Sequence, residues 1–211
     1  MNDIWIVGTS GFAIDIGARF KNVPGTGNFF MGYIDDREEN RDECKKMLKK
    51  WRMHQDVISP NSINLKDKKN RFLLGVSDPS FKSNFINGKE IDYEQIHDFR
   101  VDVNFPELGD IKDGIFFYCK VSNLTSIGYG NFIDSQTIIG HNSTIGDFNH
   151  IGVNVIVNGG CNIGNRNYIH PSAVIGKGVT IGDDCVIGAG SVVLRNVPSG
   201  SKIIAPAAIK L

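Results

Sequence analysis

The sequence predicts a chain in two parts, an α/β Rossmann-like N-terminal domain followed by a left-handed parallel β-helix. Three observations predict it. Buried-strand and helical patterns alternate through residues 3–86, and the turn GTSG at 8–11 joins the first strand pattern to the first helical one. From residue 115 onward an aliphatic residue recurs every six positions. We therefore expect one domain at 1–105 and a second at 106–211.

The N-terminal half has no internal repeat. Its elements follow in the order DIWIVG (3–8, strand), FAIDIGARF (12–20, helix), NFFMGYIDD (28–36, strand), RFLLGVSD (71–78, strand) and PSFKSNFI (79–86, helix). The charged segment 37–60 predicts an amphipathic helical insertion; its polar side is interpreted as a solvated face, with a partner-binding helix as the alternative. This order is typical of a small unit with a parallel sheet.

The C-terminal half is periodic. Fourteen Ile or Val residues stand six positions apart: Ile115, Val121, Ile127, Ile133, Ile139, Ile145, Ile151, Val157, Ile163, Ile169, Ile175, Ile181, Ile187 and Val193. A glycine often follows, and a small side chain stands four positions after each aliphatic residue. A period of six belongs neither to an ordinary strand nor to a helix.

The period fits a coil with three flat faces of six residues, so that each coil consumes eighteen residues. Successive coils would stack at the strand spacing of about 4.8 Å. We expect the aliphatic and small residues to point inward, and glycine and asparagine to supply the positive φ angles of the corners. Residues 115–198 then give between four and five coils, whose crossovers take the left-handed exception to the usual rule.

Composition argues against several classes of protein. Lys plus Arg and Asp plus Glu number 23 each, so no overall basic surface for nucleic acid is indicated. No stretch approaches the ~20 apolar residues of a membrane span, and no secretory signal is present, so we expect a cytoplasmic protein without membrane insertion. Three cysteines, Cys119, Cys161 and Cys185, fall in the small inward series and are interpreted as core residues.

The GTSG turn is the first candidate binding site. Backbone amides at Gly8, Ser10 and Gly11 can cradle an anion where a helix begins. The turn lacks the full glycine pattern of redox dinucleotide sites. We therefore expect a nucleotide or sugar phosphate at the carboxyl ends of the strands.

Three residues after the second strand pattern could complete that site. Asp35 and Asp36 stand where a carboxylate can hold a ribose hydroxyl or a base edge, and Arg37 can take a phosphate. An exposed acidic turn is the open alternative for the two aspartates.

Two histidines, His141 and His150, lie within the repeat. They occupy the third and sixth positions of their hexapeptides, whereas the inward positions are the first and fifth, so both should face outward. Nine residues is half a coil, so the two should lie on different faces and converge only across a subunit boundary. An exposed histidine without chemistry is the alternative, and His170, before Pro171 at a corner, is interpreted as structural.

The chain resembles the sugar N-acetyltransferases of the PglD type, with the NeuD-type sialic acid O-acetyltransferases as near relatives. The resemblance rests on GTSG (8–11), YIDD (33–36), IIGHNSTIGDFNHIG (138–152) and the closing coil VIGAGSVVLRNVPSGS (186–201). It implies a homotrimer, with acetyl-CoA lying along the prism between subunits. It also implies an amino sugar on a nucleotide, with the nucleotide held by the N-terminal domain.

The resemblance also implies roles for individual residues. His141 matches the general base, and His150 matches a second histidine that contacts the acetyl-CoA thioester region. Gly159 matches a backbone amide that can meet the thioester oxygen, and Asp134 falls where an asparagine lies near the acceptor amine. Asn142 departs from the pattern, since an acid normally follows the base; it can orient the imidazole without adding charge, unless Asp134 or Asp147 substitutes.

A second departure is Phe12, which replaces a histidine placed after the GxSG turn in the bacillosamine-type enzyme. Lys177, Arg195 and Lys202 could meet CoA phosphates on the later coils, although surface solubilisation is the alternative.

The sequence thus predicts an acetyl-CoA-dependent N-acetyltransferase, without a metal, acting on a nucleotide-linked 4-amino-dideoxy sugar for bacterial surface glycans. O-acetylation of a sialic acid is the nearest alternative. A non-catalytic scaffold or a metal-binding protein is the alternative of another class; three histidines could ligate a metal, but their spacing does not match the γ-class carbonic anhydrases.

Overall fold

A computed structural model gives the fold and describes residues 2–21, 29–96, 99–101, 103 and 109–206. The chain divides into two compact units. The first comprises Met1–Ser77 with Asn84–Phe99, and the second comprises Asp78–Ser83 with Arg100–Leu211. The expected boundary between residues 105 and 106 lies outside the described residues. Each unit is described by itself below.

The first unit contains a parallel sheet of four strands in the order β3-β2-β1-β4. Its elements are β1 (Asp3–Val7), α1 (Gly11–Lys21), β2 (Phe29–Ile34), α2 (Glu38–Lys50), β3 (Asp56–Ile58), β4 (Asn70–Leu74) and α3 (Pro79–Gly88), the last of which begins in the second unit, with short 3₁₀ helices at Pro60–Ser62 and Tyr93–Gln95. The predicted strand and helix alternation is confirmed. The segment 37–60 is not helical throughout, because it ends in β3, a strand too short to leave an alternating pattern.

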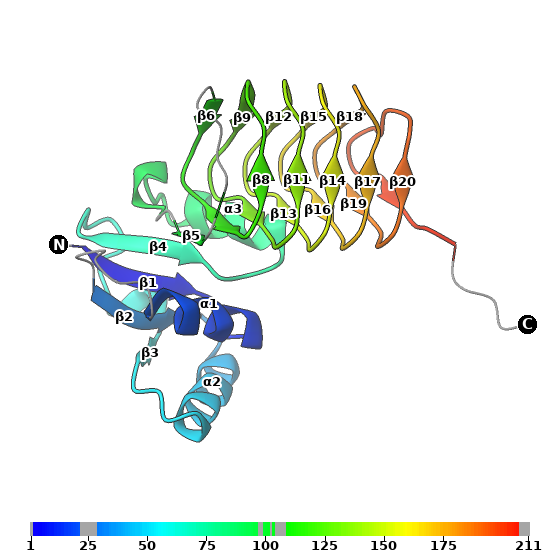
Figure 1. Ribbon diagram of the computed structural model, residues 1–211. Coiled ribbons are helices and arrows are strands. Elements are labelled where there is room, and N and C mark those ends of the chain that lie inside the picture. Colours follow the sequence, from blue (N-terminus) through cyan, green and yellow to red (C-terminus); the bar gives the residue numbers. More distant parts are fainter. Residues whose placement is uncertain (1, 22–28, 97–98, 102, 104–108, 207–211) are drawn as a thin grey trace, which may run out of the picture. The chain divides into compact units, whose positions relative to one another are not determined.

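The second unit is a parallel β-helix with three sheets as its walls (Figure 1). Sheet I contains β5 (Phe99–Val101), β7 (Ile115–Phe117), β10 (Phe132–Ile133), β13 (His150–Ile151), β16 (Tyr168–Ile169), β19 (Val186–Ile187) and β21 (Lys202–Ile203). Sheet II contains β8 (Lys120–Val121), β11 (Ile138–Ile139), β14 (Ile156–Val157), β17 (Val174–Ile175) and β20 (Val192–Val193). Sheet III contains β6 (Gly109–Ile111), β9 (Thr125–Ile127), β12 (Thr144–Ile145), β15 (Asn162–Ile163) and β18 (Thr180–Ile181). The predicted fold class is confirmed.

The register follows the predicted eighteen-residue coil except at the start. Ile133 pairs with Ile151, and Ile139 with Val157. The first coil is one residue shorter, because Ile133 pairs with Phe116. Phe116 therefore packs in the interior of the β-helix, and the prediction that Ile115 points inward was wrong.

Several corners take a positive φ at a glycine or asparagine, as predicted, among them Gly130 (64°), Gly160 (73°) and Asn142 (56°). Other corners take it at residues such as Gln136 (61°) and Phe148 (58°). The glycine that often follows the aliphatic residue has a different reason, which is the approach of the next coil. A Cβ on Gly140 would lie 2.5 Å from the Gly159 nitrogen, which no real side chain tolerates. The coils are therefore held closer at these positions than a side chain allows.

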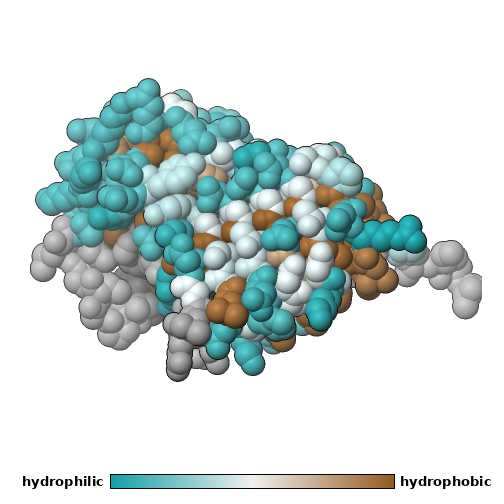
Figure 2. Space-filling model, turned by 90° about the horizontal axis from the view of Figure 1, so that it is seen from above, coloured by the Kyte–Doolittle hydropathy of each residue, from teal (hydrophilic) through white to brown (hydrophobic). Residues whose placement is uncertain are grey.

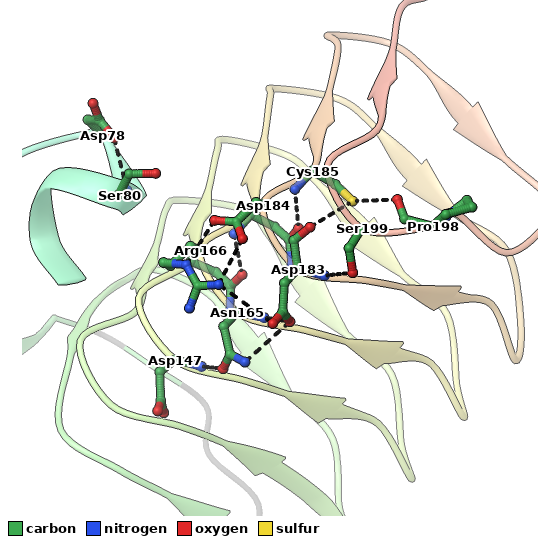
Figure 3. Close-up of polar contacts among 12 residues, drawn as sticks. Asp78, Ser80, Asp147, Asn165, Arg166, Asp183, Asp184, Cys185, Pro198 and Ser199 are labelled. Atoms are coloured by element: carbon green, nitrogen blue, oxygen red, sulfur yellow. Dashed lines mark hydrogen bonds and ion pairs between the residues drawn. The ribbon is translucent and has the colours of Figure 1, made fainter. Parts of the chain in front are cut away.

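Side-chain ladders join the coils. Inside the prism, Asn149 N donates to Asn131 Oδ1 at 2.9 Å, and Asn167 N donates to Asn149 Oδ1 at 2.8 Å. At the corner between sheets III and I, Asp147 N donates to Asn165 Oδ1 and Asn165 N donates to Asp183 Oδ1, each at 2.7 Å (Figure 3). Both ladders satisfy backbone donors that the corners leave unpaired.

We predict that Asn149→Ala lowers the free energy of unfolding by about 1–3 kcal/mol, because it leaves the buried Asn167 N–H without an acceptor. Urea unfolding followed by circular dichroism measures the change. Asn162→Ala, at an exposed strand position, is the control and should change stability by less than about 0.5 kcal/mol. Equal losses in both variants would contradict the ladder's role.

Candidate functional site

The first candidate site is a pocket of about 310 Å³ in the first unit. It is lined by Gly8, Thr9, Ser10, Gly11, Asp35, Arg37, Asn40, Glu43, Met47 and Val76. The GTSG turn that enters α1 requires glycine at its first position for two reasons. Gly8 has a φ of +106°, and a Cβ there would lie 2.6 Å from Val76 Cγ1.

Asp35 organises this pocket. Its carboxylate is 6% exposed and accepts hydrogen bonds from Thr9 Oγ1 (2.8 Å), Arg37 N (3.0 Å) and Asn40 Nδ2 (3.2 Å). It therefore ties the turn after β1 to the start of α2. Burial, followed by the charge of Asp35, raises the pKa of the nearby Cys44 thiol to about 11.

The structure brings together five of the six residues predicted in this region. Gly8, Ser10, Gly11, Asp35 and Arg37 line the pocket. Asp36 is exposed and does not line it, so its predicted binding role has no support from the geometry.

Sequence reasoning missed the contribution of α2 to the pocket. Asn40, Glu43 and Met47 stand three to four residues apart and present one face of this helix to the cavity. The spacing of these three residues could have indicated the contribution of α2, because it places them on one face of the segment that was interpreted as solvated.

The second candidate site is the corner between β11 and β12, where His141 lies exposed. His141 Nδ1 lies 2.7 Å from Asn142 Oδ1, and Asn142 is held at a φ of 56°. Because the amide oxygen is an acceptor, it fixes the hydrogen on Nδ1 and leaves Nε2 as the basic nitrogen. Among the described residues Asn142 is the polar side-chain partner of His141; neither Asp134 nor Asp147 takes that place.

The imidazole of His141 lies against Gly159 of the next coil. A Cβ on Gly159 would lie 2.8 Å from Nε2, so a side chain there would displace the ring from this position. Within the described part of the chain, the Gly159 N–H donates to no acceptor. His141 and the backbone of Gly159 thus lie against each other on one outer corner.

His150 lies outside the core of the prism but is buried rather than exposed. It belongs to sheet I and is 7% exposed, with ring centroids 4.8 Å from Phe132 and 4.5 Å from Tyr168. Burial, then the charges of Lys82 and His170, lowers its pKa to about 2, so the imidazole is neutral at any working pH. Its side chain does lie on the opposite side of the strand from the core residue Ile151.

A buried lysine, Lys82, influences His150 from the part of α3 that belongs to the second unit. Its side chain is fully buried, with Nζ 3.4 Å from the Asn149 carbonyl oxygen and 5.9 Å from the Phe132 ring centroid. Burial lowers the pKa of Lys82 to about 7, partly offset by Asp78. A residue more than sixty positions away in sequence therefore contributes a charge to the surroundings of His150.

The remaining predicted residues lie apart from these corners. His141 and His150 belong to different walls of the column, and Asp134 follows β10 with its Oδ1 accepting from Ser135 N at 2.7 Å. His170 stacks on Tyr168 with ring centroids 4.2 Å apart.

Among the described residues there is no group of three side chains suited to a metal ion. No helix in the described part is long and apolar enough to cross a membrane.

Comparison with known proteins identifies the repeat. The family model for the bacterial transferase hexapeptide (six repeats) matches residues 160–195. A search of curated protein sequences gave no match. Residues 160–195 therefore match the hexapeptide repeat, within the parallel β-helix of the second unit.

Solved structures share the fold of nearly the whole chain. A histidine-to-asparagine mutant of perosamine N-acetyltransferase from Caulobacter crescentus, in complex with CoA and GDP-perosamine, is 18% identical with a TM-score of 0.67 over 100% of this chain and 97% of that one. The acetyltransferase domain of PglB from Neisseria gonorrhoeae, in complex with acetyl coenzyme A, is 15% identical with a TM-score of 0.72 over 97% of both chains. WeeI from Acinetobacter baumannii is 14% identical with a TM-score of 0.54 over 97% of both. The fold of this chain is that of these proteins.

We predict that stability depends on the pH through Lys82. The folded pKa lies below the ordinary 10.5, so the unfolded chain binds more protons between pH 7 and 10.5 and stability rises with pH there, by up to about 1.4 kcal/mol per unit. Lys82→Met should lack this rise. The difference in unfolding free energy between the two proteins, measured at pH 6, 8 and 9.5, checks it; a constant difference would contradict the burial of Lys82.

Proposed function

We propose that the protein is an acetyl-CoA-dependent N-acetyltransferase that acts on the amine of a nucleotide-linked 4-amino-dideoxy sugar. One observation carries the proposal: the exposed imidazole of His141, fixed by Asn142, lies with its basic Nε2 against Gly159 of the next coil. Support comes from the fold shared with acetyltransferases that bind CoA, acetyl coenzyme A and GDP-perosamine. Bacterial surface glycan synthesis is the setting proposed for the product.

The chemistry is direct acyl transfer. The amine nitrogen attacks the thioester carbonyl carbon, and His141 Nε2 accepts the proton that the nitrogen must lose. The negative charge on the carbonyl oxygen meets the Gly159 N–H. The carbon–sulfur bond then breaks, and the proton passes from the imidazolium to the leaving thiolate. No cysteine serves as a nucleophile, because Cys119, Cys161 and Cys185 are buried in the prism.

The pocket of the first unit is the proposed site for the nucleotide part of the substrate. The turn amides suit a phosphate, and Arg37 is an exposed cation at its rim. Asp35 is already engaged by three donors, so its proposed role is to position the turn and Arg37.

We further propose a homotrimer. The outward positions of sheet II become aliphatic from Ile138 onward, through Ile156 and Val174 to Val192, which is 63% exposed. Figure 2 shows brown, hydrophobic side chains gathered toward the end of the β-helix, where Leu194 and Ile204 are also exposed. An apolar wall suits packing against a neighbouring chain. His141 and His150, on different walls, could then meet only across a subunit boundary.

CoA would lie along that boundary. Lys177, Arg195 and Lys202 are exposed on the later coils and carry the charge that its phosphates require. Gly159, whose amide has no acceptor among the described residues, is the group proposed to face the thioester. The burial of His150 argues against the contact with the thioester that the resemblance implies.

We predict that His141→Ala lowers kcat/KM about 10²–10⁴-fold, because the base is lost. Thiol release from acetyl-CoA is measured against UDP-, GDP- and dTDP-linked 4-amino sugars, with sialic acid as an alternative acceptor. His54→Ala, an exposed histidine outside both candidate sites, is the control. Equal rates in wild type and His141→Ala would exclude the assignment of the base, and acetylation of sialic acid alone would exclude the amine substrate.

We predict different effects from two changes at Asn142, one on the pH profile and one on kcat. Asn142→Asp places a carboxylate on the His141 Nδ1–H, which raises the imidazole pKa and moves the acid limb of the kcat/KM profile upward by about one pH unit. Asn142→Ala removes the bond that fixes the tautomer and should lower kcat about tenfold. The pH profiles of both variants check this. An acid limb that stays in place in Asn142→Asp would contradict the assignment of that limb to His141.

A further inference from the structure

The second half of α2 and the turn after it carry an unusual concentration of positive charge. Residues 45–54 read KKMLKKWRMH, which contains five Lys or Arg residues, one histidine and no acid. We call Lys45, Lys46, Lys49, Lys50, Trp51, Arg52 and His54 the α2 basic surface. All seven are exposed, although the chain as a whole has a net charge of zero.

The fold holds these residues in place. Cys44 and Leu48 are the buried residues of α2, so the lysines occupy the remaining faces of the helix. Arg52 takes a φ of 55° and ends the helix, with Met53 N donating to the Leu48 oxygen at 2.9 Å. The turn therefore belongs to the helix end and presents Trp51 and Arg52 beside Lys49 and Lys50.

The charge of this surface is not neutralised within the described chain. Lys45 has one carboxylate partner, Asp42, at 3.6 Å. Lys46, Lys49, Lys50 and Arg52 pair with no carboxylate among the described residues. Lysines in the last turn of a helix interact favourably with the helix dipole, and Lys49 and Lys50 stand there. This interaction does not account for the other cations or for the exposed aromatic side chain beside them.

A cavity and an exposed tryptophan lie beside these charged residues. The cavity, of about 350 Å³, is lined by Lys45, Leu48, Lys49, Arg52, Met53, His54 and Gln55. Its cationic rim and apolar base suit a phosphate group attached to an apolar body. Trp51 is 67% exposed, and Lys50 Nζ lies 5.6 Å from its ring centroid.

We propose that the α2 basic surface docks on a bilayer of anionic phospholipid, with a lipid phosphate in the cavity and Trp51 at the headgroup level. Lysine-rich helices with a tryptophan bind at such interfaces, and each Lys or Arg near the surface contributes about a fivefold gain in partitioning. A lipid fits better than nucleic acid, because the chain is neutral overall and the surface has one aromatic residue rather than a stacking series. The docking is peripheral and independent of the proposed acetyl transfer.

Co-sedimentation of the full chain with vesicles tests this proposal. Vesicles with 30% phosphatidylglycerol in phosphatidylcholine should bind the protein at low ionic strength, and pure phosphatidylcholine vesicles should not. Replacing Lys45, Lys46, Lys49 and Lys50 by Gln should weaken binding several hundredfold. The matched control replaces Lys66, Lys68, Lys69 and Lys89 by Gln, which removes the same charge from exposed positions elsewhere in the first unit and should change binding much less.

A second readout keeps the test decisive if the quadruple variant fails to fold. The chain has two tryptophans, and Trp5 is 6% exposed, so an emission blue shift on anionic vesicles reports on Trp51 and should vanish in Trp51→Phe. Three outcomes would overturn the proposal: no binding of wild type to anionic vesicles, equal losses in both quadruple variants, or tighter binding to a DNA duplex or to polyglutamate than to the vesicles.

Discussion

The close stacking of eighteen-residue coils is the constraint on which the second unit depends. At many positions after the inward aliphatic residue the next coil lies too close for a Cβ; one added to Gly140 would lie 2.5 Å from the Gly159 nitrogen. The ring of His141 lies against Gly159 in the same way. The glycines that permit the close stacking thus also make room for the His141 imidazole.

The column also separates functions by wall. Each two-residue strand sends one side chain inward and one outward, so an eighteen-residue coil offers three outward positions of different character. On sheet II these positions are largely aliphatic, on sheet III they are polar residues such as Thr144 and Asn162, and on sheet I they include Phe132 and His150. Distinct surfaces for association and chemistry therefore arise from one repeat, without any change in its backbone.

Much of the fold follows from the sequence, because the six-residue period is a local property repeated many times. The features that the sequence did not predict arise from local departures from the repeat or from long-range contacts. Phe116 replaces Ile115 inside because the first coil is one residue short, and β3 was missed because three residues carry too little pattern. The site was less predictable. Position in the hexapeptide gives the exposure of His141, but the burial of His150 depends on packing against neighbouring coils, which includes the Phe132 and Tyr168 rings. The engagement of Asp35 by Thr9 and Asn40 likewise depends on the tertiary fold.

The central claim is that the corner bearing His141 is where acyl transfer takes place. A crystal structure of the protein with CoA and a nucleotide-linked amino sugar tests it most directly. The predicted result is an acceptor nitrogen about 2.6–3.2 Å from His141 Nε2, with the CoA sulfur on the side of Gly159. An acceptor amine bound away from this corner, with His141 facing only solvent, would contradict it.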